Sequence, residues 1–332
     1  MSARHRLEYL AVRGATAIAA ALSHLFSIRT LVEAAARLGR SYARLGAPRV
    51  DVARINLEIA FPDWSARDRA VVLIESFADS ARSLAELLLL QGPHRGALLR
   101  SFRLEGESEV RDALANSPSG GVIALTAHFG SWELSAVGAQ HLGIPVCVVH
   151  RSFSNPLIAE LLKSWRVAAG IDVVALGRAG FGVLRALRRG KVVVMLADQD
   201  AKRSEGVFAP FFSRLASSRS GPAMIAMTTD TPVLPVFTFR EKSASGEWGH
   251  VMRVLPPLAL ECAGDDEQAA IVRNVTRMNV AIEDAIRLSP EHWMWAHRRW
   301  RTQPDGAPRS YPSRHGRDGP APSSPGHAGQ VS

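Results

Sequence analysis

The chain of 332 residues carries a formal charge of +9 at pH 7 and contains only two cysteines, Cys147 and Cys262. This length allows one or two domains with a large core, and so few cysteines exclude a disulfide-rich or thiolate-cluster protein. The positive charge predicts attraction to an anionic partner, a class that includes nucleic acid, an acidic carrier protein and an anionic membrane.

The first distinctive segment, residues 14–28, is uncharged and mostly apolar and lies between Arg13 and Arg29. It is shorter than the roughly 20 residues that span a bilayer, and it contains His24. Its basic flanks favour a helix in the membrane interface; the alternative is an ordinary amphipathic helix packed on the protein. We find no persuasive secretory cleavage site. Residues 1–30 are therefore predicted to form an interfacial or membrane-anchoring helix.

Residues 31–100 show several helical patterns and no convincing strand. One helix is predicted to end at Pro62, and Ser65 is predicted to cap a second helix that continues to about residue 90. The sequence Gln91-Gly92-Pro93 then ends that helix. We therefore expect an all-helical N-terminal region.

From about residue 102 to 240, apolar strands alternate with helical patterns, which is typical of an α/β layer. The predicted strands are 122–125, 146–150, 172–175, 192–196, 233–239 and 251–255. The predicted helices are 133–141, 156–169, 182–189, 222–229 and 265–288. We assign residues 101–303 to one α/β domain with a C-terminal helix.

The end of the chain, residues 304–332, is rich in Pro, Gly, Ser, Arg and His. It has hardly any large apolar residue to offset the entropy lost on ordering. It is therefore predicted to be a disordered tail.

The stretch 128–133, His-Phe-Gly-Ser-Trp-Glu, joins a predicted strand to a predicted helix. On one continuous helix His128 and Glu133 would point about 140° apart, so they cannot pair as helix neighbours. With His128 in the loop and Glu133 in the first helical turn, the carboxylate can fold back to the imidazole and fix its tautomer. His128 can then take a proton from a hydroxyl, and Gly130 would let a substrate approach the backbone. A core histidine with a helix-capping glutamate gives the same pattern.

This stretch resembles the HxxxxE/D signature of glycerolipid-type acyltransferases, and more specifically the lipid A biosynthesis (lauroyl/myristoyl) acyltransferase family. Other blocks resemble the same family in the same order over about residues 7–304. They are Arg54-Ile55-Asn56-Leu57 with Ala60-Phe61-Pro62, Arg151 with Asn155-Pro156-Leu157, Gly190 to Gln199 with Ala197 in place of a glycine, Val207 to Phe212, Gly221-Pro222-Ala223, and Pro290 to Trp300.

The resemblance implies a glycerolipid-acyltransferase-like α/β sandwich with a mixed sheet, and direct acyl transfer without an acyl-enzyme. In this scheme His128, oriented by Glu133, deprotonates an acceptor hydroxyl, which attacks a thioester. The arginine and aspartate of the family map to Arg166 and Asp198. Their alternative roles are a solvated helix face and a strand-end turn.

Ser131 lacks a nucleophile elbow, so an N-cap is its expected role. Arg151 and Asp200 lie close by in the sequence and are the alternative positions for this arginine and this aspartate. The predicted substrate-binding residues are Gly130, Arg151, Asn155, Gln199, Lys202 and Arg203; the basic ones suit phosphates on the acceptor or donor.

Other interpretations stay open. The cluster of Trp293, Trp295 and Trp300 suits either a membrane-interface belt or a buried lid with cation–π contacts. The loop from Gly177 to Gly182, with Asp198 as the ribose acid, would suit a dinucleotide-binding protein, although its glycine order departs from GxGxxG. No motif supports nucleic-acid binding or a metal site, and we predict no cofactor.

The sequence thus predicts a membrane-associated O-acyltransferase of lipid A and lipopolysaccharide biosynthesis on the cytoplasmic face of the inner membrane. The predicted donor is acyl carrier protein, with acyl-CoA second. The predicted acceptor is a hydroxyl of a glycolipid, most simply a lipid A precursor. A phosphatidylinositol mannoside or an ornithine-type lipid would use the same chemistry.

Overall fold

The computed structural model describes residues 2–150, 155–175, 179–242, 248–262, 264 and 266–312, so Arg151 lies outside the described residues. Within them, one sheet has the strand order β1-β9-β8-β2-β5-β3-β4. Its strands are β1 (Phe102–Glu105), β2 (Val122–Thr126), β3 (Val146–His150), β4 (Asp172–Ala175), β5 (Val192–Leu196), β8 (Val233–Lys242) and β9 (Trp248–Val254). β9 runs antiparallel to β8, and the other neighbours are parallel. The sheet is therefore mixed, as predicted.

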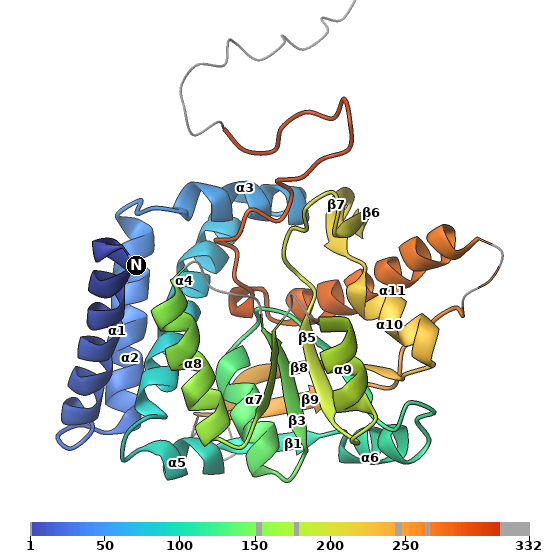
Figure 1. Cartoon of the computed structure of the whole chain (residues 1–332). Helices are drawn as coiled ribbons and strands as arrows, with labels where there is room; N and C mark the ends of the chain where they lie inside the picture. The colour runs from blue at the N-terminus through green and yellow to red at the C-terminus, as the bar shows by residue number, and fades with distance from the viewer. Residues whose placement is uncertain are drawn as a thin grey trace, which may run out of the picture.

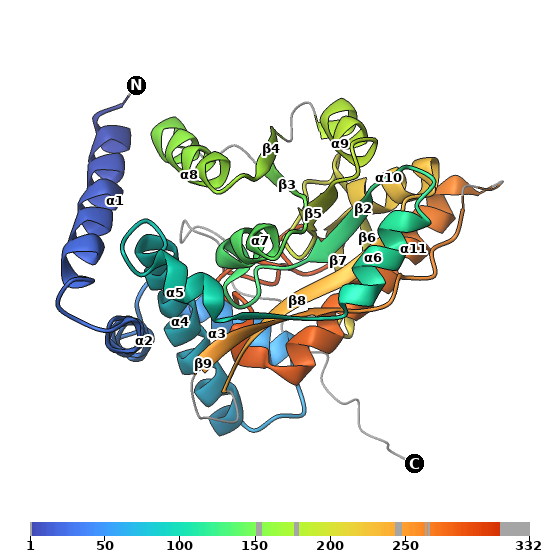
Figure 2. The ribbon, with the colours of Figure 1, turned by 90° about the horizontal axis from the view of Figure 1, so that it is seen from below.

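Helices cover both faces of this sheet (Figure 2). On β2, Ile123 and Leu125 join a core cluster with residues of α9 (Ala179–Leu187), α10 (Gly221–Thr229) and α11 (Glu267–Leu288). Val122 and Ala124 point to the opposite face, which is covered by α5 (Arg95–Arg100), α6 (Glu107–Ala115) and α7 (Trp132–His141). Because the central strands are buried on both faces, they are continuously apolar, and this is why the sequence predicted them well.

Three strands escaped the sequence analysis. β1 is a four-residue edge strand that contains Arg103 and Glu105. β6 (Gly206–Phe211) and β7 (Arg214–Arg219) form a separate antiparallel hairpin that packs on α11. Pro210 lies within β6. Because proline is rarely found in a central strand of a sheet, it argued against a strand at this position of the sequence.

Four helices form the N-terminal region: α1 (Ala3–Leu22), α2 (Ile28–Arg44), α3 (Val50–Ala60) and α4 (Ala66–Leu89). The Ser65 side chain caps α4, as predicted, by accepting a hydrogen bond from the Asp68 N–H. α2 packs closely on α4, since a Cβ on Gly39 would lie 2.4 Å from the Phe77 carbonyl oxygen. This helical region precedes the sheet, as expected.

The predicted continuous segment 14–28 is divided between two helices, because α1 ends at Leu22 and α2 begins at Ile28 (Figure 1). The Ser27 hydroxyl caps α2 by accepting from the Thr30 N–H, and this cap interrupts the apolar run. α1 buries none of its residues. Among the described residues, no helix is long and apolar enough to span a bilayer.

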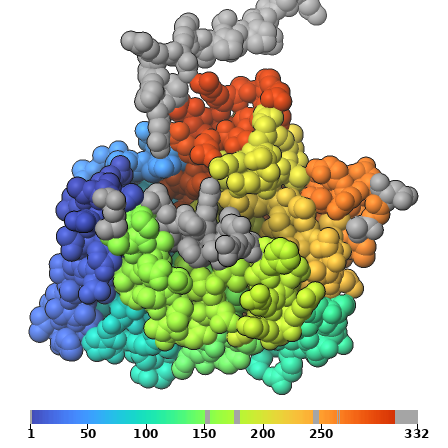
Figure 3. All heavy atoms as spheres, in the orientation of Figure 1, coloured from blue at the N-terminus to red at the C-terminus, as the bar shows by residue number. Residues whose placement is uncertain are grey.

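The C-terminal segment, residues 293–312, packs back onto the protein between α3 and the β6–β7 hairpin (Figure 3). Trp293, Trp295 and Trp300 are each at most 1% exposed, so the tryptophans form a buried lid and not an interface belt. Tyr311 is also buried, and its hydroxyl donates to Asn56 Oδ1. The compositional boundary at residue 304 is therefore too early; residues 313–332 lie outside the described residues.

Candidate active site

The register of two neighbouring strands brings His128 and Asp198 together. β2 and β5 are parallel, and Thr126 pairs with Leu196 at their carboxyl ends. Two residues further along each strand, His128 Nδ1 lies 2.9 Å from Asp198 Oδ1, and the His128 backbone N–H donates to Asp198 Oδ2 at 3.1 Å. The carboxylate therefore fixes both the ring and the backbone of the histidine.

Asp198 is 2% exposed, and its environment keeps it ionised. Burial alone would raise the pKa of Asp198, but the charge and hydrogen bonds of His128 and the indole N–H of Trp293, 2.9 Å away, lower it to about 2. A buried carboxylate that accepts from Nδ1 selects the tautomer in which Nε2 carries the lone pair. His128 Nε2 can then act as a base, and Gln199 Nε2 lies 3.2 Å from it.

The predicted pairing of Glu133 with the imidazole is wrong. Glu133 lies in the first turn of α7 and binds Arg166 of α8 (Pro156–Ala168), with Arg166 Nε donating at 3.1 Å and Nη2 donating to the other carboxylate oxygen. His128 lies in the loop and Glu133 in the first turn of α7, as expected, but the Glu133 carboxylate is engaged by Arg166 and not by the imidazole. The carboxylate that contacts the imidazole is that of Asp198.

Arg166 is 8% exposed and so does not lie on a solvated helix face. Its Nη1 is buried and has no hydrogen-bond partner among the described residues. The Glu133–Arg166 pair thus ties α7 to α8 and keeps one guanidinium donor unused.

Gly130, predicted to bind a substrate, is engaged by the protein through both of its backbone polar groups. It has φ +54°, and a Cβ there would lie 2.3 Å from the Thr238 carbonyl oxygen of β8. Its N–H donates to the His292 carbonyl at 2.8 Å, and its carbonyl accepts from the Ser83 hydroxyl at 3.1 Å. Only glycine allows the turn after His128 to pack this closely on β8.

A buried ionic network lies under the same turn, and the sequence analysis missed it. Arg240 at the end of β8 donates to Glu86 of α4, to Asp79 at 3.2 Å and to the Ser131 hydroxyl at 3.1 Å. Burial opposes both charges, yet their mutual attraction raises the pKa of Arg240 and lowers that of Glu86. Ser131 occupies the N-cap position of α7 as expected, but its hydroxyl binds this network and does not cap the helix.

The remaining predicted substrate residues are mostly engaged by the protein. Asn155 caps α8 by accepting from the Leu157 N–H, and its amide donates to the His5 carbonyl and to Glu8, so it fastens α1. Lys202 is exposed beside Glu205, and Arg203 binds the C-terminal segment at Gln303 and Asp305. Of the predicted set, Gln199 is the described residue placed against His128.

Asp200, the alternative to Asp198 for the aspartate of the family, binds the C-terminal segment. It accepts from the Thr302 N–H at 2.8 Å and pairs with Arg301 at 2.9 Å. The dinucleotide interpretation needs the carboxylate of Asp198 for a ribose, yet both of its oxygens already accept protein donors. Residues 176–178 of the glycine loop lie outside the described residues.

An apolar cavity of about 50 Å³ lies near His128. The Trp132 ring lies 5.2 Å from the His128 ring, centroid to centroid, and Trp132 and Phe129 line the cavity. Its inner wall lies between the sheet and helices α6 and α7 and includes Val110, Ala136, Ala139, Val192 and Val254. His128 therefore lies next to Trp132, one of the residues that line this apolar space.

Comparisons with known proteins agree with this geometry. The model of the family described as bacterial lipid A biosynthesis acyltransferase matches residues 3–302. The chain is 28% identical to the lipid A biosynthesis lauroyltransferase of Escherichia coli K12, over 82% of this chain and 86% of that protein. It is 28% identical to the palmitoleoyltransferase of the same organism, over 79% and 82%, and 23% identical to its myristoyltransferase, over 83% and 82%. The chain is thus an acyltransferase and belongs to the bacterial lipid A biosynthesis acyltransferase family.

Proposed function

We propose that this protein transfers a fatty acyl chain from a thioester donor directly to a hydroxyl of a lipid A precursor, with His128 as the general base. The observation that carries the proposal is the contact between His128 Nδ1 and the buried, ionised Asp198, which leaves the lone pair on Nε2. No serine or cysteine nucleophile is needed, and the Ser131 hydroxyl is already bound within the network of Glu86 and Arg240.

The chemical step follows from this arrangement. His128 Nε2 takes the proton of the acceptor hydroxyl as its oxygen attacks the thioester carbonyl, and Asp198 stabilises the imidazolium that forms. The carbon–sulfur bond then breaks, and the imidazolium returns the proton to the leaving thiolate. The products are an ester and a free thiol, and His128 is again neutral.

The apolar cavity beside Trp132 is the proposed site of the acyl chain. Its lining suits a hydrocarbon, and Trp132, which lines it, lies against the proposed base. At about 50 Å³ it is smaller than a fatty acyl chain, so α6 and α7 must move away from the sheet to admit one. Larger side chains at Ala136 or Ala139 are expected to favour shorter acyl chains.

We propose acyl carrier protein as the donor, with acyl-CoA as the second candidate, because an acidic carrier protein suits the charge of +9. We propose that the protein works on the cytoplasmic face of the inner membrane. α1 buries none of its residues and exposes Leu7, Leu10 and Ile18, each more than 60% exposed. Such a helix suits the membrane interface, where the acceptor lipid is found.

The test combines gene deletion with mass spectrometry of the membrane lipids. Removing the gene should delete one acyl chain from lipid A, and wild type and His141→Ala, which alters an exposed histidine of α7, should restore it. His128→Ala should not. Rescue by His128→Ala would remove His128 as the base, and a change confined to another lipid would point to a different acceptor. Purified protein with acyl carrier protein or CoA thioesters then decides the donor.

A further inference from the structure

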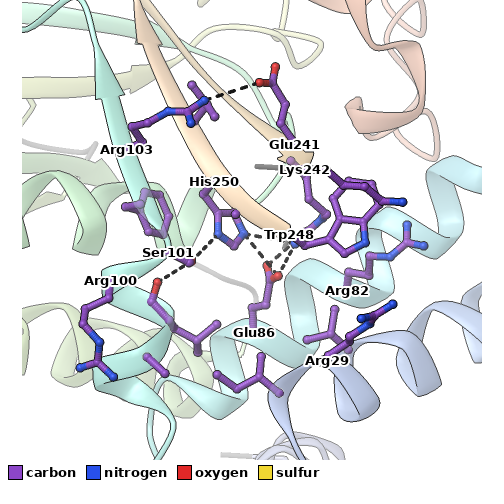
Figure 4. A pocket seen from close by; sticks show the side chains of 18 of the residues that line it. Arg29, Arg82, Glu86, Arg100, Ser101, Arg103, Glu241, Lys242, Trp248 and His250 are labelled. Atoms are coloured by element: carbon purple, nitrogen blue, oxygen red, sulfur yellow. Dashed lines mark hydrogen bonds and ion pairs between the residues drawn. The ribbon is translucent and has the colours of Figure 1, made fainter. Parts of the chain in front are cut away.

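A second cavity, of about 680 Å³, lies at the edge of the sheet, away from the residues that bind His128 (Figure 4). It is formed by the start of α2, by α4 and α5, and by the adjoining ends of β1, β8 and β9. Its volume falls within the range of sites that bind small organic ligands, roughly 300 to 1,000 Å³. The acyl-transfer scheme gives this cavity no role.

Part of the cavity wall is made of buried side chains. Glu86 and Arg240 form their ion pair there, and the His250 ring stacks on Phe102 with centroids 4.7 Å apart. The Ser101 hydroxyl lies 3.0 Å from His250 Nδ1 and donates to the Leu98 carbonyl. The Leu98 carbonyl and the His250 ring thus hold this serine in the wall of the cavity.

The charges around the cavity do not balance. Six cationic side chains and three carboxylates line it, which leaves an excess of three positive charges. Each carboxylate is already paired with one of these cations: Glu33 with Arg82 at 3.4 Å, Glu86 with Arg240, and Glu241 with Arg103 at 3.9 Å.

Three cations on the rim therefore remain without a carboxylate partner among the described residues: Arg29, Arg100 and Lys242. Figure 4 shows Lys242 and Arg29 on one side of the cavity and Arg100 on the other. The Lys242 ammonium lies 5.1 Å from the centroid of the Trp248 ring, and that ring is 47% exposed. An anion entering the cavity would thus meet unpaired guanidinium and ammonium groups beside an aromatic surface.

We propose that this cavity binds an organic phosphate. Guanidinium and ammonium donors suit phosphate oxygens. The cavity is far larger than a bare phosphate, and Trp248, Phe102 and Val32 provide apolar wall for the organic part. The proposal does not rest on the acyl-transfer reaction.

Two sources of such a phosphate are distinguishable: a soluble phosphate ester and the headgroup of an anionic phospholipid. The turn between α1 and α2 precedes Ile28 and Arg29 of the cavity and exposes Leu25 and Phe26, 75% and 47% exposed. These side chains would touch a lipid surface next to the cavity, so a lipid source makes a specific prediction about vesicles.

The experiment measures binding to the full chain by calorimetry and by vesicle co-sedimentation. The soluble probe is glycerol 3-phosphate; the lipid probes are vesicles of phosphatidylcholine with and without phosphatidylglycerol. The double variant Arg100→Gln/Lys242→Gln removes two cations of the rim. The matched control, Arg111→Gln/Arg188→Gln, removes the same charge from exposed positions outside the cavity.

The cavity variant is expected to lose at least about tenfold in affinity for a probe that wild type binds, and the control less than about twofold. Binding of glycerol 3-phosphate identifies a soluble phosphate ester; binding of phosphatidylglycerol vesicles alone identifies a lipid headgroup. Equal losses in both variants would assign the attraction to net charge and overturn the proposal. It is likewise overturned if wild type binds neither probe at about 10 mM phosphate. Unchanged melting temperatures check that both variants fold.

Discussion

Asp198 accepts two hydrogen bonds from His128, one from the ring and one from the backbone N–H, at 2.9 and 3.1 Å. The carboxylate thus fixes the ring orientation and also the point at which the chain leaves β2. A third donor, the Trp293 indole, comes from the far end of the chain. His128, Asp198 and Trp293 thus come together from three segments that are distant in sequence.

The first prediction concerns this contact. Asp198→Asn should keep hydrogen bonds to the Trp293 indole and the His128 N–H but lose the charge that stabilises the imidazolium. We expect the acyl-transfer kcat to fall by about 10²- to 10⁴-fold, the range for an impaired general base. The check is a steady-state assay together with a melting temperature. An active Asp198→Asn would show that the carboxylate does not support the base.

The second prediction concerns the contribution of the Glu133–Arg166 pair to stability. Glu133→Gln leaves Arg166 buried without its carboxylate and should lower the free energy of unfolding by about 1–3 kcal/mol. The double variant Glu133→Gln/Arg166→Met should recover part of this loss, since it also removes the unpaired charge. Denaturant unfolding measures both. If the single variant is as stable as wild type, the pair does not fasten α7 to α8.

The third prediction concerns Gly130, in the turn after His128. Gly130→Ala places a methyl group 2.3 Å from the Thr238 carbonyl oxygen at positive φ, so the turn or β8 must shift. We expect a loss of about 2–4 kcal/mol of stability and a loss of acyl transfer. Gly14→Ala in α1 is the control, because nothing lies within 4 Å of its added Cβ. It should be neutral or stabilising by up to about 1 kcal/mol.

The fourth prediction is a pH dependence of stability. Burial lowers the pKa of His297 from 6.5 to about 4, and His297 Nε2 accepts a hydrogen bond from the Asp200 N–H at 3.1 Å. Between these two values the unfolded chain binds a proton that the folded chain does not. Stability should therefore fall as the pH decreases from about 6.5 to about 4, by about 1–3 kcal/mol from this residue.

Denaturant unfolding at pH 7 and pH 4.5 measures this effect. His297→Gln should lose less stability than wild type between the two pH values, whereas His141→Gln, on the exposed surface, should behave as wild type. Identical pH slopes for wild type and His297→Gln would contradict the assignment.

The central strands and most helices could be predicted from sequence because their signals are local. Apolar runs such as β2 and β5 are buried on both faces, and the Ser65 cap of α4 lies next to the helix that it begins. The short edge strand β1 and the hairpin containing Pro210 were missed, since charged residues and proline mask a strand that tertiary contacts stabilise.

The sequence by itself determined the α/β layer, the helical N-terminal region and the family resemblance, and it predicted the role of His128. Only the tertiary structure decided which side chains His128 and Glu133 contact. His128 and Asp198 meet because two parallel strands align Thr126 with Leu196, and register between distant strands is not visible in a local pattern. Glu133 lies only five residues from His128 but binds Arg166 of α8. The position of α8 relative to α7, and not proximity in sequence, decides the partner of this side chain.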